Sequence, residues 1–245
     1  MGDLDFSGKT VLVVGGSSGI GNGIAQGFRG HGAQVHVWGT RGSASDYSKD
    51  EGSDLAGLAY QQVDVADSLA IETCKPPFSR LDVLVLAQGI VLYKRGEFEM
   101  RGFEKVIGVN LNSLMACAMK FRDMLAAAKG SLITISSTSA YHATRGNPAY
   151  NASKAGVVGL TRTLGEAWAR DGIRVNGIAP GLVDTKLTKV TTENPERLSR
   201  ALAGIPLGRL GQPADMAGVA LFLASPLAAY VVGQTIPVDG GLILA

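Results

Sequence analysis

The sequence predicts an α/β fold in which one parallel β-sheet carries helices on both faces. Short apolar runs alternate along the chain with longer segments whose apolar residues recur at helical spacing. The short runs are rich in Val, Leu and Ile and lack polar alternation, which is typical of parallel strands covered on both sides. No Pro- or Ser-rich linker and no charge run divides the chain, so we expect one domain over residues 1–245.

Alternating strands and helices predict a doubly wound sheet, whose elements follow in chain order. The expected strands are Thr10–Val14, Gln34–Trp38, Ala59–Val63, Val83–Ala87, Ser131–Ser136, Arg174–Ile178 and Thr235–Val238. The expected helices are Gly19–Gly30, Ser68–Cys74, Phe103–Ala128, Tyr150–Asp171 and Pro213–Ala224. Residues 39–57 are rich in Gly, Ser and Asp, so we expect a loop there.

A glycine-rich turn joins the first expected strand to the first expected helix. It reads Gly15-Gly16-Ser17-Ser18-Gly19-Ile20-Gly21. Glycine lets the backbone approach a phosphate closely, and the free N–H groups at a helix start attract anions. The spacing differs from Gly-x-Gly-x-x-Gly, and the Gly-Lys-Ser/Thr of a P-loop is missing. The turn favours a dinucleotide pyrophosphate, and the alternative is a flexible loop.

Three further segments follow expected strands, namely Ala87-Gln88-Gly89, Ser137 and Pro180. The carboxyl ends of parallel strands meet at one edge of the sheet, and ligands of doubly wound sheets bind there. We therefore expect these segments to converge with the glycine-rich turn on one site.

Tyr150 and Lys154 lie four residues apart in an expected helix, so they share a helix face. A free phenol titrates at about pH 10, and a neighbouring ammonium favours its phenolate form. Tyr150 could then act as a general acid/base near neutral pH, with Ser137 holding a carbonyl oxygen beside it. A Tyr-x-x-x-Lys pair alone is equally typical of a solvated helix face. The glycine-rich turn upstream favours the catalytic interpretation.

The composition argues against several function classes. A net charge of +2 gives no reason to expect nucleic-acid or anionic-membrane binding. Two cysteines, Cys74 and Cys117, predict no disulfide framework and fit a reducing cytoplasm. His31, His36 and His142 lack metal-ligand spacing, so no metal is expected. No apolar run has the length of a membrane span, and no signal-peptide pattern opens the chain.

The order and spacing of these motifs resemble the short-chain dehydrogenase/reductase family. The resemblance runs from about Gly8 to Gly241. Its motifs are the Gly15–Gly21 turn, Asp64, Asn110, Ser137, Tyr150 with Lys154, Pro180-Gly181 with Thr185, Arg209–Pro213, Phe222–Ser225 and Val238–Gly241. The resemblance implies a single-domain, seven-stranded Rossmann-type fold. It also implies hydride transfer between a nicotinamide cofactor and the carbon of a ketone or secondary alcohol.

The family pattern also implies roles for individual residues. Tyr150 would be the general acid/base, Lys154 would lower its pKa and bind the nicotinamide ribose, and Ser137 would bind the substrate oxygen. Asn110 would bend a helix and hold a proton-relay water. The implied cofactor contacts are Gly15, Ser17, Ser18, Gly19, Ile20, Gly21, Thr40, Arg41, Asp64, Val65, Ala87, Gln88, Gly89, Tyr150, Lys154, Pro180, Gly181, Val183 and Thr185.

The end of the second expected strand predicts the kind of nicotinamide cofactor. Family members that prefer NAD usually carry an acidic residue there, which bonds the ribose hydroxyls and repels a 2′-phosphate. Gly39 stands at that place, and Thr40 and Arg41 offer a hydroxyl and a guanidinium that suit a phosphate. We expect NADP, with NAD as the alternative.

Two positions depart from the family pattern. Val14 replaces the usual threonine before the glycine-rich turn, and Leu86-Ala87-Gln88-Gly89 replaces Asn-Asn-Ala-Gly. The threonine and the asparagine motif lie together in the family, so we hypothesise that an apolar contact between Val14 and Ala87 replaces a polar one.

Residues 182–205 leave the end of an expected strand, are polar and are expected to form a mobile substrate lid with a short helix. The alternative is an ordinary surface connection. The expected substrate pocket is a mixed wall of aromatic, polar and apolar groups that would take a medium-sized ketone. It consists of Ser139, Tyr141, His142, Asn147, Leu182 and the 186–205 segment, with Tyr93 as a further candidate.

Two other functions remain open. One is 3-oxoacyl-carrier-protein reduction, for which Lys129, Arg170 and Arg174 would supply the basic surface that meets an acidic carrier protein. The other is a catalytically idle cofactor sensor, which would have no need of a general acid. The expected partners are copies of the same chain, in a homotetramer or homodimer that pairs helices 103–128 and 150–171.

Overall fold

The computed structural model describes residues 2–49 and 52–244, and a seven-stranded sheet forms its centre. The strands are β1 (Thr10–Val14), β2 (Gln34–Gly39), β3 (Ala59–Gln62), β4 (Val83–Leu86), β5 (Ser131–Ile135), β6 (Arg174–Pro180) and β7 (Thr235–Val238). They are arranged in the order β3-β2-β1-β4-β5-β6-β7, and every pair is parallel. The predicted Rossmann-type fold is confirmed, with all seven expected strands in place.

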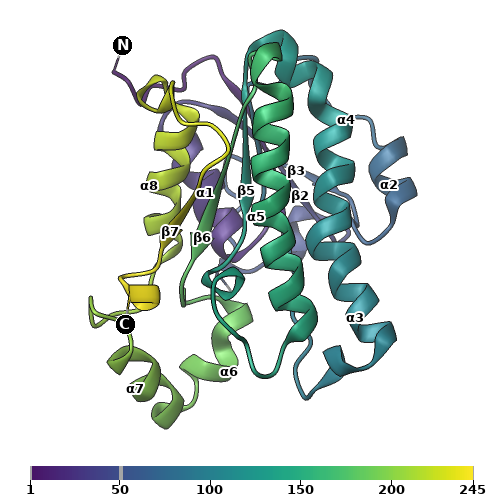
Figure 1. Ribbon diagram of the computed structural model, residues 1–245. Coiled ribbons are helices and arrows are strands. Elements are labelled where there is room, and N and C mark those ends of the chain that lie inside the picture. Colours follow the sequence, from purple (N-terminus) through teal and green to yellow (C-terminus); the bar gives the residue numbers. More distant parts are fainter. Residues whose placement is uncertain (1, 50–51, 245) are drawn as a thin grey trace.

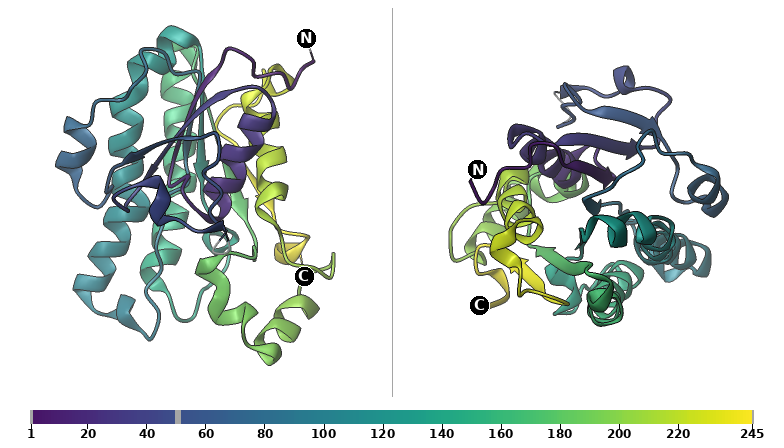
Figure 2. Two further views of the ribbon diagram at one scale, coloured as in Figure 1. Left: turned by 180° about the vertical axis from the view of Figure 1, so that it is seen from behind. Right: turned by 90° about the horizontal axis from the view of Figure 1, so that it is seen from above.

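Two helix layers cover the sheet, as the alternation predicts (Figure 1). Helices α1 (Gly19–Gly30) and α8 (Pro213–Ala224) lie on one face, while α4 (Ser113–Ala128) and α5 (Pro148–Trp168) lie on the other. The left view of Figure 2, turned by 180° from Figure 1, shows the face that α1 and α8 cover. A short α2 (Ser68–Thr73) packs beside α4.

Each face of the sheet builds its own apolar core, because successive strand residues point to opposite sides. Val11 and Val13 of β1 belong to the core under α1 and α8. Leu12 and Val14 belong to the core under α4 and α5, together with Trp38. All five residues are buried, so nearly continuous apolar strands are what this fold requires.

The expected helix Phe103–Ala128 is divided in the structure. It consists of α3 (Met100–Ile107), a π-helical turn (Gly108–Asn112) and α4. The buried Asn110 lies in the π turn, and its side chain bonds both backbone groups of Ile90, at 2.8 and 2.9 Å. A tertiary contact therefore accompanies the local change of helical pitch, which helical spacing alone does not reveal.

The segment 182–205 holds more helix than the single short piece expected. It contains a 3₁₀ turn (Lys186–Thr188), α6 (Lys189–Thr192) and α7 (Pro195–Ala203), which lie beyond the carboxyl ends of the strands (Figure 1). Further 3₁₀ turns are Ala44–Asp46, Gly96–Phe98, Thr138–Ala140, Ala169–Asp171, Pro226–Ala228 and Leu242–Leu244. Over residues 2–49 and 52–244, none of the helices combines the length and apolarity that a membrane crossing needs.

Candidate active site

A cavity of about 540 Å³ opens at the carboxyl edge of the sheet. Its walls come from the segments after β1, β2, β3, β4, β5 and β6, together with Tyr150 and Lys154 of α5. Every residue predicted to contact the cofactor lines this cavity except Arg41. Lys105 of α3 and Lys186 of the lid segment add two positive side chains to the walls.

The glycine-rich turn forms a tight cradle at one end of the cavity. Gly15 and Gly19 adopt φ values of 75° and 54°, which favour glycine. A Cβ at Gly15 would lie 2.8 Å from the backbone nitrogen of Gln88, and one at Gly21 would lie 2.2 Å from the Gly15 carbonyl oxygen. Side chains are therefore excluded at Gly15 and Gly21. The N-terminus of α1 stays accessible to an anion. This geometry fits a dinucleotide cofactor.

The end of β2 has no room for a side chain. A Cβ at Gly39 would lie 2.5 Å from the Tyr47 hydroxyl and 2.6 Å from the Ser17 hydroxyl. The backbone N–H groups of Thr40 and Arg41 each donate to the Tyr47 hydroxyl at 3.1 Å. Tyr47, which the sequence analysis did not single out, thus occupies the space next to Gly39 where a side chain would lie.

Arg41 lies beside the cavity and not in its wall. Its guanidinium stacks on the Tyr47 ring, 4.7 Å from the ring centroid, and donates to the Asp46 carbonyl oxygen. Thr40 lines the cavity directly. The two residues predicted to meet a 2′-phosphate are therefore adjacent but differently placed.

Tyr150, Ser137 and Lys154 meet at the other end of the cavity, as their spacing predicts. Ser137 follows β5 and accepts a hydrogen bond from the backbone N–H of Ser139 at 3.1 Å. Lys154 is buried, and its Nζ donates to the Ile135 carbonyl oxygen at 2.9 Å. The same Nζ lies 5.6 Å from the centroid of the Tyr150 ring.

The electrostatics of this trio differ from the sequence-based expectation in one respect. Burial raises the pKa of Tyr150, the Ser137 hydroxyl lowers it, and the charges of Tyr93 and Glu97 raise it again, so the net shift is upward. Burial also lowers the pKa of Lys154 to about 8. In the protein without cofactor, the net shift of the Tyr150 pKa is thus upward, although the Lys154 ammonium beside the ring favours the phenolate.

Asn110 supports the site from behind. It does not line the cavity, is fully buried, and its Nδ2 donates to the Ile90 carbonyl and, at 3.2 Å, to Ser153 Oγ of α5. Its side chain therefore ties the π turn to the segment after β4 and to the helix that carries Tyr150.

Sequence reasoning missed Glu97, a buried acid behind Tyr150. Its Oε2 accepts the backbone N–H of Tyr150 at 2.9 Å, although the two residues are 53 positions apart. The signal that could have found it is the first turn of α5, which begins with Pro148 and contains no acid of its own.

The single residues predicted to form the substrate pocket do not line the cavity, whereas the start of the predicted segment 186–205 does. Tyr141 and His142 are exposed, and the Asn147 amide is bound to the Leu92 carbonyl and to Glu97, both at 3.2 Å. Ser139 lies behind Ser137, with their hydroxyl oxygens 3.0 Å apart. Lys186, Leu187 and Thr188 of that segment line the cavity together with Ile90.

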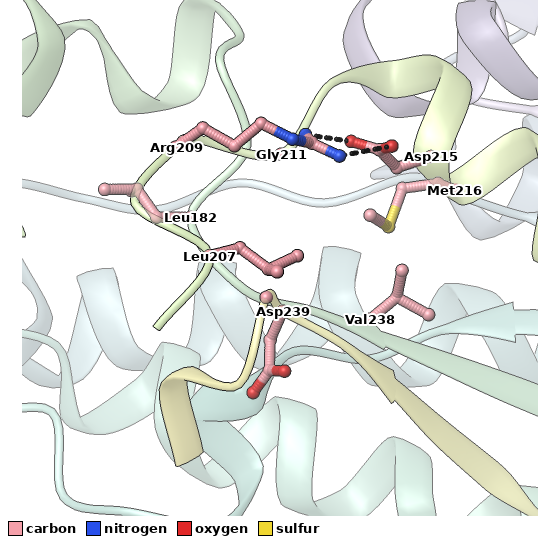
Figure 3. A pocket seen from close by; sticks show the side chains of 9 residues that line it. Leu182, Leu207, Arg209, Gly211, Asp215, Met216, Val238 and Asp239 are labelled. Carbon is pink, nitrogen blue, oxygen red and sulfur yellow. Dashed lines mark hydrogen bonds and ion pairs between the residues drawn. The ribbon is translucent and has the colours of Figure 1, made fainter. Parts of the chain in front are cut away.

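Leu182 lines a second, smaller cavity of about 210 Å³ (Figure 3). Leu207, Met216 and Val238 give this cavity apolar walls. At its rim the Arg209 guanidinium bonds the Asp215 carboxylate through two contacts of 2.8 and 3.0 Å. Asp239 also lines the cavity and accepts the backbone N–H groups of Gly241 and Ile243, at 2.9 and 3.0 Å.

The hypothesised apolar contact between Val14 and Ala87 is not formed. The Val14 side chain belongs to the core under α4 and α5, whereas Ala87 packs against the core under α1 and α8. Their link is a backbone hydrogen bond from the Ala87 N–H to the Val14 carbonyl at 2.9 Å. The two departures therefore lie on opposite faces of the sheet.

Among the described residues, no group of three or more His, Cys, Asp and Glu is arranged to hold a metal ion. Arg174, which was expected to offer basic surface, is bound inside the fold. Its guanidinium donates to the carbonyls of Leu223, Ala224, Ser225 and Ala228 and to Ser131 Oγ.

Comparisons with known proteins agree with this fold and cavity. A family model described as enoyl-(acyl carrier protein) reductase matches residues 14–243. The 3-oxoacyl-[acyl-carrier-protein] reductase FabG of Chlamydia pneumoniae is 38% identical, over 98% of this chain and 99% of the relative. The 2-dehydro-3-deoxy-D-gluconate 5-dehydrogenase of Bacillus subtilis is 36% identical, over 97% and 96%. The gluconate 5-dehydrogenase of Burkholderia cenocepacia, in complex with NADP and tartrate, matches with a TM-score of 0.88 and 29% identity, over 99% of this chain and 98% of that chain.

The fold, the cavity and these similarities define a nicotinamide-dependent oxidoreductase. The chain belongs to the short-chain dehydrogenase/reductase family. It is an enzyme of the class that acts on CH–OH groups with NAD(P).

Proposed function

We propose that this protein interconverts a ketone and a secondary alcohol with NADP(H), using Tyr150 as the general acid/base. The observation that carries the proposal is that Ser137, Tyr150 and Lys154 line the same cavity as the glycine-rich cradle. The bound cofactor would supply or accept the hydride.

The chain's own residues handle the proton and the substrate oxygen. In reduction, the Tyr150 phenol gives its proton to the carbonyl oxygen, and in oxidation its phenolate takes a proton from the hydroxyl. Ser137 donates a hydrogen bond to the same oxygen, where charge develops in the transition state. Lys154 places a positive charge behind this pair, held in position by the Ile135 carbonyl.

The preference for NADP over NAD follows from the end of β2. Position 39 carries no acid that would repel a 2′-phosphate, and a Cβ there would have to displace the Tyr47 and Ser17 hydroxyls. Thr40 lines the cavity and Arg41 lies next to it. The gluconate 5-dehydrogenase from Burkholderia cenocepacia was crystallised with NADP, which supports the same choice here.

The second candidate is reduction of a 3-oxoacyl group on a carrier protein, which the similarity to FabG favours. Of the basic residues expected to meet a carrier, Arg174 is bound to the C-terminal end of α8 and is not available. We therefore favour a free small ketone. A higher kcat/KM for a carrier-linked 3-oxoacyl substrate than for every free ketone in a panel would reverse this preference.

The Tyr150→Phe variant tests the mechanism. The change removes the exchangeable proton and keeps the ring, so NADPH binding should stay near the wild-type value while turnover falls by at least about 100-fold. Absorbance of the reduced nicotinamide reports turnover, and fluorescence of bound NADPH reports binding, with NADH measured in parallel. Tyr230→Phe, at a fully exposed position, is the matched control. Turnover that survives in Tyr150→Phe refutes the assignment. NADPH binding without turnover on any ketone would identify a cofactor sensor.

A further inference from the structure

Glu97 is an acidic side chain that is 1% exposed and lies against the first turn of α5. It belongs to the 3₁₀ turn Gly96–Phe98, which follows β4. Its Oε2 accepts the backbone N–H of Tyr150 at 2.9 Å. Its Oε1 accepts the N–H of Leu92 at 3.0 Å and the side-chain amide of Asn147 at 3.2 Å. The two carboxylate oxygens are therefore bound to donors from two segments, one at Leu92 and one at Asn147 and Tyr150.

These contacts make Glu97 the cap of α5. The first N–H groups of a helix lack partners within it, and the dipole there favours a negative charge. Asn147 at the N-cap position makes no capping bond of its own, and the first turn has no acid. Glu97 supplies both the acceptor and the charge from a distant part of the chain. A buried carboxylate needs such donors in turn, since without them its burial is unfavourable. The position of the turn that carries Tyr150 thus depends on Glu97.

The charge of Glu97 also acts on the phenol. Burial is the largest cause that raises the pKa of Tyr150, Ser137 opposes it, and Tyr93 and Glu97 add to it. Lys154 faces the phenol from α5 itself, while Lys105 of α3 and Lys186 line the cavity. A carboxylate at this place disfavours the phenolate and so favours the form that donates a proton.

We propose that Glu97 is a positioning residue for Tyr150. Its hydrogen bonds anchor the first turn of α5, and its negative charge disfavours the phenolate form of Tyr150. The inference rests on the proposed role of Tyr150 as the general acid/base. It assigns to Glu97 two separable effects, one from its hydrogen bonds and one from its charge.

The charge effect is tested with Glu97→Gln, which removes the charge and nearly keeps the shape, although its NH2 group cannot accept the hydrogen bond that one carboxylate oxygen accepts. NMR of protein labelled at the tyrosine Cζ measures the Tyr150 titration without cofactor or substrate, and the signal missing in Tyr150→Phe assigns it. We expect the Tyr150 pKa to fall. The midpoint of the pH–rate profile for alcohol oxidation should move to lower pH by the same amount. The rate of carbonyl reduction should begin to decline at a correspondingly lower pH. Glu99→Gln, exposed two residues further on, should leave both profiles unchanged.

The capping effect is tested with Glu97→Asp, which keeps the charge but is one methylene shorter. We expect a lower kcat and a lower midpoint of thermal unfolding, with the pH profile unchanged. An unshifted Tyr150 titration in Glu97→Gln overturns the inference, as does a shifted titration in Glu97→Asp. If Glu97→Gln does not fold, Glu97→Asp still decides. Turnover that survives in Tyr150→Phe would instead overturn the proposed function, so the two failures are distinguishable.

Discussion

Lys154 is a buried ammonium at the edge of the substrate end of the cavity. The side chain is 4% exposed, and its Nζ bonds the Ile135 carbonyl. Desolvation disfavours the charged form, which lowers the pKa of Lys154 from 10.5 to about 8. The residue can thus lose its proton at a pH where an ordinary lysine keeps it. Its charge is therefore a function of pH within a range that enzymes experience.

The low pKa of Lys154 makes the stability of the protein depend on pH. Between about 8 and 10.5, the unfolded chain binds a proton at this site that the folded chain has released, so unfolding free energy rises with pH there. Across the full window the rise is up to about 3 kcal/mol. We expect it in wild type and not in Lys154→Met. Urea unfolding of both proteins at about pH 7 and about pH 9.5 measures the difference. An equal pH dependence in the two proteins would contradict it.

For single residues, local sequence patterns predicted some members of the site and missed others. The glycine-rich turn and the Tyr150–Lys154 pair are short-range patterns, and both line the cavity. Glu97 and Tyr47 act through contacts that the chain makes after folding, and in sequence each is one polar residue in a loop. The net upward shift of the Tyr150 pKa was also missed, because its largest cause is burial and spacing does not reveal how deeply a side chain is buried.

Helices α1 and α8 pack unusually closely through two glycines of α1. A Cβ at Gly23 would lie 2.4 Å from the Pro213 Cβ and 2.9 Å from its carbonyl carbon. One at Gly27 would lie 2.9 Å from the Ala217 Cβ. The two helices form the layer that covers one face of the sheet, and α1 starts at the glycine-rich turn. The close packing therefore fixes the helix whose N-terminus faces the cavity.

The packing of α1 on α8 predicts a large effect for a single added methyl group. Gly23→Ala should destabilise the fold by about 1–3 kcal/mol, because the methyl group meets backbone as well as side-chain atoms of Pro213. Gly218→Ala in α8 has no atom within 4 Å of its new Cβ and should stabilise by up to about 1 kcal/mol through helix propensity. Chemical denaturation compares the two variants with wild type. If Gly23→Ala were as stable as Gly218→Ala, the contact between α1 and α8 could take up a methyl group without cost, and the prediction would be wrong.

The elements themselves were predictable where their causes are local. Each expected strand lies within about two residues of its observed limits. The clearest are β1 and β4, whose continuous Val and Leu runs between polar segments admit few alternatives. The break at Gly108–Asn112 was implied only by the family resemblance of Asn110. Its physical reason is the set of bonds that Asn110 makes to Ile90 and Ser153, which periodicity does not contain.

Over the whole molecule, α4 has both an inner and an outer apolar surface. Leu114 and Ala118 are buried against the sheet, so part of the apolar face expected to pair with another subunit only covers the core. Met115 and Met119 point outward, with 37% and 52% of their surfaces exposed, and lie four residues apart on one helix face. Together the two methionines form an exposed apolar patch on the outer face of α4, and such a patch is typical of an interaction site.

We propose that the chain forms a homodimer or homotetramer in which Met115 and Met119 are buried against a second copy. Two charges in an apolar interface are unfavourable, so Met115→Glu combined with Met119→Glu should give a particle with a smaller mass. The fold should survive, because neither side chain belongs to the apolar cores. Light scattering coupled to size exclusion measures the mass, and circular dichroism checks the fold. Met100→Glu, at an exposed position that begins α3, should keep the wild-type mass. A monomeric wild-type protein, or an unchanged mass in the double variant, would place the outer face of α4 in solvent.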